Sequence, residues 1–396
     1  MKLLLLNAGS SSLKCTLIDS STSEVLASSL ADWAGSATIY HYSGPTGEDR
    51  HKEVSWKGHA EAVRRVIQDI VRGGDSAASD RSDIAAVGHR IVHGGQFTSS
   101  VRITPEVRSR ITALADLAPL HNPPSLETLA AAEAALPSVP HVAVFDTAFH
   151  STIPPEASLY PIPRAWTDDW GIRRFGFHGL SHAYCSRRAA ELLKRPLKEL
   201  RLVICHLGHG CSATAVVGGR SVDTTMGFTP LEGLMMGTRC GSIDPSIVLH
   251  VQEHHGLTVT QVESALNHES GLLGVSGQSA DMRSVLKSAN EGNVNARTAL
   301  AIYSRRVRQA IGALTVTMGG IDALVFTAGV GENAKSVRKD ICAGLQCLGL
   351  ELDTGANDNC KPDADIANRN SPNRILVIKT REDLTMLQEV LQVLGE

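Results

Sequence analysis

The sequence opens with KLLLLNAGSSSLKCTLID at residues 2–19, and a similar arrangement returns as RLVICHLGHGCSATAVV at residues 201–217. Each stretch has a β-rich apolar run, a tight turn of small residues, and a second apolar run that leaves the turn. The turns lie at residues 7–12 and 208–212. Two such units about 200 residues apart form a weak internal repeat, which predicts a duplicated domain.

Strand and helix signals alternate along the rest of the chain. Val63, Ile67 and Ile70 recur at spacings of four and three, which is typical of one face of a helix. Strands are predicted at 84–87, 141–145, 323–326 and 375–378, and helices at 60–71, 125–135, 182–193, 296–318, 336–345 and 383–394. This alternation favours an α/β architecture.

A proline-rich stretch at residues 154–163 is the linker candidate. It predicts a domain boundary near residue 150.

Composition excludes several classes of protein. The chain has 396 residues, of which 42% are hydrophobic and 20% charged, so it is not a mostly disordered protein. With a formal charge of −3, the chain lacks the excess of basic residues that would indicate binding to nucleic acid or to an anionic membrane. The leucine run at 3–6 is too short for a secretion signal, and no apolar run is long enough to span a bilayer. The eight cysteines form no Cys-x-x-Cys pair, so we expect reduced thiols in a cytoplasmic protein.

Two glycine-rich segments fit a phosphate-binding pattern. Residues 329–334 read Gly-x-Gly-x-x-Ala after a predicted strand and before a predicted helix, and also come close to a P-loop. Residues 208–213 fit the same pattern, but the run at 213–217 and the glycines at 218–219 predict a hairpin there. Small residues let backbone N–H groups approach phosphate oxygens. We infer a nucleotide held between two related domains.

Four charged or ionisable residues lie inside short apolar or glycine-rich segments. Arg90 follows a predicted strand, Asp146 ends another, His178 lies between glycines, and Arg239 lies in the polar, glycine-rich stretch 223–245. A lone arginine is usually a surface ion pair, and a lone histidine is usually structural. Together they suit phosphoryl transfer, which needs in-line positioning and positive charge around the transferring group. A catalytic zinc site is not expected, because no His-x-x-x-His has a Glu directly after its first His, as the His-Glu-x-x-His motif of zinc proteases requires.

The motifs together resemble those of the acetate kinases, in the superfamily of acetate and sugar kinases, Hsp70 and actin. The resemblance runs nearly end to end, at residues 7–14, 88–95, 118–123, 145–150, 175–182, 226–233, 237–239 and 326–333. It implies a duplicated ribonuclease H-like two-domain α/β fold with a central active-site cleft. The first domain, at residues 1–150 plus 383–396, would be the N-terminal acetokinase domain. The second, at residues 151–382, would serve nucleotide binding and dimerisation in a homodimer.

The resemblance also implies a reaction and a set of site residues. The reaction is reversible, Mg²⁺-dependent phosphoryl transfer from ATP to acetate, with Mn²⁺ as the alternative metal. The residues implied in catalysis are Asp146, His178, Arg239 and Arg90. Those implied around acetate are Arg90, Val92, Leu120, Phe177 and Pro230, and those implied at the metal are Asn7 and Glu382. Those implied around ATP are Ser10, Ser12, Lys14, His206, Leu207, Gly208, His209, Gly210, Asp281, Met282, Arg283, Gly329, Val330, Gly331, Glu332 and Asn333.

Four residues depart from the family pattern and bear on nucleotide preference. His209 replaces a usual Asn, Ser242 a common Asp, Met282 a usual Phe, and Arg381 a common Asn. The family assigns an acid/base role at Asp146, but an acetate nucleophile is already ionised and has no proton to lose. We therefore expect Asp146 to hold magnesium or to orient an arginine.

Three other functions remain open at this point. A propionate or butyrate kinase differs only in a small apolar pocket. A pyrophosphate-dependent relative is disfavoured by residues 329–333. An actin-like or Hsp70-like ATPase would bind a protein partner, but it would not need the set of Arg90, His178 and Arg239.

Overall fold

The computed structural model describes residues 1–44, 49–71, 77–78, 80–118 and 121–396. Its contacts divide the chain into two compact units. The first consists of Met1–Phe149 with Arg381–Glu396, and the second of His150–Thr380.

The first unit contains an eight-stranded sheet in the order β5-β4-β3-β2-β1-β6-β8-β7. Strands β1 to β5 form an antiparallel meander, whereas β6 pairs in parallel with β1, and β8 pairs in parallel with β6. The strands are β1 (Lys2–Ala8), β2 (Ser12–Asp19), β3 (Val25–Asp32), β4 (Thr38–Ser43), β5 (Asp49–Val54), β6 (Ile84–Ile91), β7 (Val101–Arg102) and β8 (His141–Phe145). Parallel pairing places the carboxyl ends of β1, β6 and β8 at one edge of the sheet.

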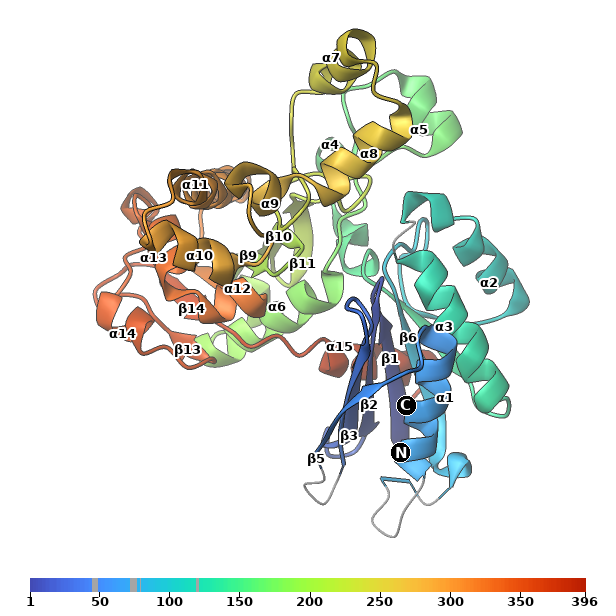
Figure 1. The fold of residues 1–396 in the computed structure, drawn as a ribbon. Coiled ribbons are helices and arrows are strands. Elements are labelled where there is room, and N and C mark those ends of the chain that lie inside the picture. Colours follow the sequence, from blue (N-terminus) through green and yellow to red (C-terminus); the bar gives the residue numbers. More distant parts are fainter. Residues whose placement is uncertain (45–48, 72–76, 79, 119–120) are drawn as a thin grey trace. The chain divides into compact units, whose positions relative to one another are not determined.

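Helices cover both faces of this sheet. Successive residues of a strand point to opposite faces, and Val87 packs with the apolar side of α1, whereas a side chain at Gly88 would meet Val390 and Met386 of α15. Figure 1 shows α1 and α3 side by side, in agreement with their packing. The helices are α1 (His59–Val71), η1 (Arg81–Asp83), α2 (Pro105–Thr112), η2 (Ala115–Leu117), α3 (Asn122–Ala135) and α15 (Glu382–Leu394), with η3 (Ala148–Thr152) running into the second unit.

The second unit repeats the strand order of the first. Its sheet runs β11-β10-β9-β12-β14-β13, in which β9 to β11 are antiparallel and β9, β12 and β14 are parallel. This matches β3-β2-β1-β6-β8, so the internal repeat seen in the sequence is a repeat of topology. The strands are β9 (Arg201–Leu207), β10 (Cys211–Val217), β11 (Arg220–Thr224), β12 (Ala323–Thr327), β13 (Ala364–Asp365) and β14 (Arg374–Val377).

The helices of the second unit surround its sheet. The longest of those described, α11, begins where Asn293 accepts a hydrogen bond from the Ala296 N–H at 2.8 Å, and it buries Tyr303, Val307 and Ile311 at helical spacing. The helices are α4 (Pro155–Ser158), α5 (Arg164–Trp170), α6 (Gly179–Leu193), η4 (Leu197–Glu199), α7 (Ser246–His255), α8 (Val259–His268), α9 (Gly271–Ser276), α10 (Met282–Asn290), α11 (Val294–Thr317), α12 (Ala328–Asn333), α13 (Lys335–Cys342), η5 (Gln346–Leu348) and α14 (Thr354–Asp358).

Most of the predicted elements are present, and three expectations need correction. The proline-rich stretch 154–163 is not a linker, because it contains α4 and lies inside the second unit, whereas the crossing between units falls within η3. Residues 329–333 do not form an open turn before a helix, because they are themselves helical in α12. Glu382 begins α15 and belongs to the first unit. The functional assignment of the two domains stays a prediction.

Within the part of the chain that the structure describes, no helix has the length and apolarity needed to cross a membrane.

Candidate active site

Four of the predicted site residues meet in the first unit, at the carboxyl ends of its parallel strands. Ile91 pairs with Phe145 across β6 and β8, so Arg90 and Asp146 lie at the same edge of the sheet. Arg90 Nε donates to Asp146 Oδ1 at 2.9 Å, and Arg90 Nη2 donates to Oδ2 at 2.5 Å. Arg90 Nη1 donates to Asn7 Oδ1 at 3.0 Å and lies 3.9 Å from Glu382 Oε2. The planar guanidinium is therefore held on three sides.

The electrostatics of this cluster favour a charged arginine. The Asp146 side chain is 1% exposed and that of Arg90 is 17% exposed. Burial would lower the pKa of Arg90, but the charges of Asp146 and Glu382 offset it, so the pKa lies above its ordinary value. The carboxylates of Asp146 and Glu382 and the guanidinium of Arg90 together have a formal charge of −1.

The same cluster fits a hard divalent metal. Asn7, Asp146 and Glu382 offer amide and carboxylate oxygens, the donors that Mg²⁺ prefers. No group of three or more His, Cys, Asp or Glu side chains placed to hold a metal exists among the described residues. That is compatible with Mg²⁺, which usually keeps several waters and takes only one or two protein carboxylates.

The β1–β2 turn carries the first set of predicted phosphate ligands. The Gly9 N–H donates to the Ser12 carbonyl at 2.8 Å, which closes the turn. Lys14 is exposed and is the register partner of Asn7 on the neighbouring strand, so the two side chains share a face. Ser10 is exposed and Ser12 half-buried on the same turn.

The residues predicted to contact acetate are divided between the two units. Val92 belongs to the first unit and is buried after β6, where the amide of Asn122 exchanges two hydrogen bonds with the His93 backbone. Phe177 and Pro230 belong to the second unit, and Phe177 is 1% exposed. Leu120 lies outside the described residues.

A cluster of histidines and serines surrounds the start of α6 in the second unit. His178 precedes α6 with a φ of 58°, and its Nδ1 lies 2.9 Å from Ser212 Oγ. His182, one turn later, places its Nε2 2.8 Å from the same Oγ. Ser212 on β10 is the register partner of His206 on β9, and the His206 ring stacks on His178 with centroids 4.1 Å apart.

Arg239 and His178 converge above the backbone of Gly210. A Cβ at that position would lie 2.7 Å from Arg239 Nη2 and 3.3 Å from His178 Nε2, so only glycine leaves the space between them. Arg239 Nη1 donates to the Pro230 carbonyl at 2.7 Å, which ties the arginine to a predicted pocket wall. Burial lowers the pKa of Arg239, with an opposing effect from Cys211, but a guanidinium keeps its charge at neutral pH. Arg239 Nη2 and His178 Nε2 thus face the same small space beside Gly210.

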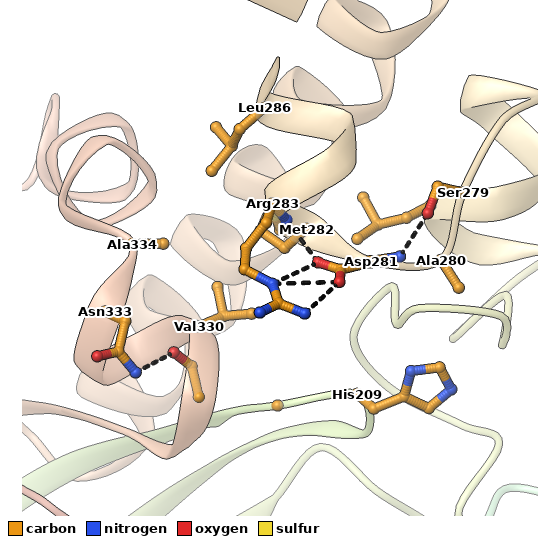
Figure 2. Close-up of a pocket in the computed structure, with 13 residues that line it drawn as sticks. His209, Ser279, Ala280, Asp281, Met282, Arg283, Leu286, Val330, Asn333 and Ala334 are labelled. Atoms are coloured by element: carbon orange, nitrogen blue, oxygen red, sulfur yellow. Dashed lines mark hydrogen bonds and ion pairs between the residues drawn. The ribbon is translucent and has the colours of Figure 1, made fainter. Parts of the chain in front are cut away.

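A cavity of about 800 Å³ lies beside this turn, lined by α10, α12 and the β9–β10 loop. Figure 2 shows Asp281 and Arg283 paired at its rim, with Val330 and Asn333 on α12 and His209 on the β9–β10 loop. Asp281 caps α10 by accepting from the Arg283 N–H at 2.7 Å, and Met282 is buried behind it. The lining consists of Gly208, His209, Leu272, Ser279, Ala280, Asp281, Met282, Arg283, Leu286, Gly329, Val330, Asn333 and Ala334.

Some predicted nucleotide residues do not line the cavity. His206 and Leu207 are buried in β9, and Gly331 is buried in α12. Glu332 Oε1 instead accepts from the backbone N–H groups of Ala328 and Thr380, at 3.0 and 3.1 Å.

Several lining or site residues escaped the sequence analysis. Leu272, Ser279, Ala280 and Leu286 line the cavity without belonging to any quoted motif, and Ala334, the last residue of the motif at 329–334, was not named as a site residue. Ser212 and His182 were also missed as site residues. The strand pairing of residues 201–207 with 211–217 was a signal that could have brought Ser212 beside His206.

The other departures from the family pattern have local partners. Ser242 Oγ accepts from the Gly233 N–H at 3.2 Å, and its own N–H donates to the Gly233 carbonyl at 2.9 Å. Arg381 pairs with Asp383 at 2.7 Å at the start of α15.

Comparisons with known proteins agree along the whole chain. The family described as the Acetokinase family matches residues 2–388. Acetate kinase of Gloeobacter violaceus is 48% identical over 402 residues, covering 99% of each chain, and that of Alkaliphilus metalliredigens is 45% identical over 391 residues, covering 98% of this chain and 99% of the relative. The crystal structure of Porphyromonas gingivalis acetate kinase superposes with a TM-score of 0.91 at 36% identity, covering 99% of each chain. A propionate kinase from Francisella tularensis gives 0.91 at 40% identity, covering 98% of each.

Proposed function

This chain belongs to the acetokinase family, and we therefore propose that it transfers the terminal phosphoryl group of ATP reversibly to acetate, giving acetyl phosphate and ADP. Its fold is the duplicated ribonuclease H-like fold of the actin and sugar kinase superfamily. The observation that carries the proposal is the convergence of Arg239 and His178 over Gly210, beside the cavity that would take the nucleoside.

The phosphoryl group would be held by donors of the second unit. In phosphoryl transfer the charge spreads over the equatorial oxygens, so fixed donors aimed at them stabilise the transition state. Arg239 Nη2 is such a donor, and His178 Nε2 is a second one in the tautomer that carries the ring proton there. An acetate oxygen would form its bond to phosphorus as the bond to the bridging oxygen of ADP breaks, and no proton has to move.

Acetate would be oriented by Arg90. A guanidinium binds a carboxylate through paired hydrogen bonds, and its own position is held by Asp146 and Asn7. Val92, Phe177 and Pro230 stay predicted contacts of the methyl group, as does Leu120, which lies outside the described residues. Asp146 would act by orienting Arg90 and through the metal, and no acid/base step is assigned to it.

The nucleotide and its metal would have separate sites. The adenosine would occupy the cavity beside Met282, with the phosphates directed toward residues 208–210 of the same unit. Ser10, Ser12 and Lys14 of the first unit stay predicted phosphate ligands. We propose Mg²⁺ as the metal, with Mn²⁺ as the alternative, held by Asn7 and Glu382. When bound, the ion neutralises charge on the polyphosphate.

A cytoplasmic homodimer completes the proposal. Apolar side chains stand exposed on neighbouring helices, with Ile247 47% and Leu249 59% exposed on α7, and Val259 72% exposed at the start of α8. Exposed apolar residues of this kind support an interface between subunits. Light scattering coupled to gel filtration would measure the mass, and a monomer at micromolar concentration would contradict the dimer.

Propionate is the second candidate acceptor, because a similar solved structure is a propionate kinase. One methylene changes the free energy of binding by roughly 1–3 kcal/mol, so we expect propionate to react more slowly than acetate without being excluded.

The deciding experiment traps the acyl phosphate with hydroxylamine. The purified chain is incubated with ATP and Mg²⁺ and with acetate, propionate or butyrate. We expect hydroxamate to form fastest with acetate and to disappear with EDTA. A preference for a longer acid would reassign the substrate, and ATP turnover without any acid and without hydroxamate would favour an actin-like or Hsp70-like ATPase.

Two arginine variants provide the matched control. Arg90→Leu should abolish hydroxamate formation, since it removes the carboxylate ligand. Arg164→Leu removes an arginine of α5 whose side chain is 91% exposed and pairs with Asp168, so it should retain activity.

A further inference from the structure

A continuous hydrogen-bonded chain runs behind the candidate phosphoryl site. It links three side chains: His182 Nε2 lies 2.8 Å from Ser212 Oγ, and Ser212 Oγ lies 2.9 Å from His178 Nδ1. His182 and Ser212 are completely buried. Among the described residues Ser212 Oγ has no other hydrogen-bond partner, so its single buried proton is satisfied only by donation to one of the two rings, and the oxygen accepts from the other.

His182 lies at the buried end of this series of hydrogen bonds, and its surroundings determine which atom donates in each bond. His182 Nδ1 is buried and has no hydrogen-bond partner among the described residues. Burial, together with the neighbouring His150 and His206, holds the pKa of His182 well below its ordinary value, so the ring is neutral. A neutral ring carries one proton, and a buried N–H without an acceptor is rarer than an acceptor with an unused lone pair. The proton therefore belongs on Nε2, where Ser212 accepts it.

The direction of the hydrogen bond between Ser212 and His178 follows from the proton on His182 Nε2. Since Ser212 accepts from His182, its own hydroxyl proton must be donated to His178 Nδ1. His178 Nδ1 then carries no proton, and its single proton lies on Nε2. That nitrogen is the one that faces Arg239 across Gly210.

We propose that Ser212 and His182 are positioning residues, which fix His178 in the tautomer that presents an N–H to the phosphoryl group. This inference rests on the proposed function, because it assigns a purpose to the Nε2 proton. In the other tautomer, Nε2 would direct a lone pair at an anionic oxygen, and one of the two converging donors would become a repulsive group. The hydrogen bonds that hold His178 thus support phosphoryl transfer, the same step that Arg239 supports.

The tautomer can be measured without any assay of activity. The full chain is labelled with ¹⁵N-histidine, and two-bond ¹H–¹⁵N correlation spectra distinguish the protonated ring nitrogen. The His178 signals are assigned by their loss in His178→Gln. We expect His178 to carry its proton on Nε2 at neutral pH, and a proton on Nδ1 would overturn the proposal.

Kinetics of variants test the functional consequence. Ser212→Ala should lower kcat at least about tenfold, because the choice of tautomer alone is worth up to about 10⁴-fold in an enzyme whose histidine is the general base. KM for ATP and for acetate should stay within about twofold. His182→Leu should behave similarly, whereas His182→Gln should recover most of the rate, because its amide can donate to Ser212.

A buried serine on α6 serves as the control. Ser186 is 1% exposed and donates to the Ala183 carbonyl at 2.8 Å, away from His178. Ser186→Ala should lose one buried hydrogen bond without changing kcat. Wild-type kcat and an unchanged His178 spectrum in Ser212→Ala would refute the positioning role. Absence of hydroxamate in the wild-type protein would instead refute the proposed function, and the spectra would still report the tautomer.

Discussion

The strongest single test of the site is Asp146→Asn, which keeps the shape of the side chain and removes its charge. Asp146 accepts two hydrogen bonds from Arg90, and its side chain is 1% exposed. Removing one partner of a buried ion pair typically costs about 3–5 kcal/mol, because the remaining charge stays buried. Arg90 is 17% exposed and keeps Asn7 and Glu382 as partners, so we discount the cost to about 2 kcal/mol.

We expect a loss of the same size in the stabilisation of the transition state for acetate, because Arg90 is the group that orients it. At about 1.4 kcal/mol per factor of ten, misplacement of Arg90 should lower kcat/KM for acetate about 30-fold. Loss of the carboxylate should also raise the Mg²⁺ concentration that gives half-maximal rate. Both are measured by hydroxamate formation, with acetate or Mg²⁺ varied in turn.

Asp322→Asn is the matched control for this measurement. Asp322 lies in the second unit, where it accepts from Arg201 and Arg195, and its side chain is 16% exposed. It should lower the melting temperature without changing kcat/KM for acetate. An unchanged kcat/KM for acetate in Asp146→Asn would refute the orienting role, and an unchanged magnesium dependence would refute the role at the metal.

Three further changes have defined outcomes. Gly210→Ala should lower kcat at least tenfold with little change in melting temperature, because its Cβ would lie 2.7 Å from Arg239 Nη2; Gly312→Ala, where nothing lies within 4 Å, should instead stabilise α11 by about 0.5–1 kcal/mol and leave kcat unchanged. Burial lowers the pKa of His150 from 6.5 to about 4, so the unfolded chain takes up this proton first as the pH falls, and stability present above pH 6.5 should decrease by about 3 kcal/mol toward pH 4. Melting curves should show a shallower acid slope for His150→Gln, and an equal slope would contradict this assignment. Asp281→Ala removes the N-cap of α10, so it should cost about 1 kcal/mol of stability and raise KM for ATP, and an unchanged KM would remove Asp281 from the nucleotide site.

The sequence predicted the parts of this fold that depend on short-range pattern. The alternation of strands and helices, the hairpin at residues 201–217 and the amphipathic α1 were all recognisable, because side-chain periodicity reports which face an element buries. Segments dominated by glycine or proline were predicted less well. Residues 329–333 became helical, and the stretch at 154–163 was taken up into the second unit.

The candidate site was predictable where one residue type carries the chemistry. Arg90 and Asp146 could be selected because both follow predicted strands, and ends of parallel strands meet at one edge of a sheet. Ser212 and His182 could not be selected in this way. Serine and histidine are common in loops and cores, and nothing near them in the chain marks a hydrogen bond between them.

Local pattern along the chain thus indicated a duplicated domain, the glycine turns and the resemblance to the acetokinase family. The contacts that give those residues a role depend on folding. Arg90 meets Asp146 from 56 positions away, and His178 meets Ser212 from 34 positions away. Such contacts follow from the register of paired strands and the packing of α6. The sequence has 16 histidines, and it does not show which of them join the hydrogen bonds behind the candidate phosphoryl site. Only the folded chain decides this, because only packing brings distant donors and acceptors within 3 Å of each other.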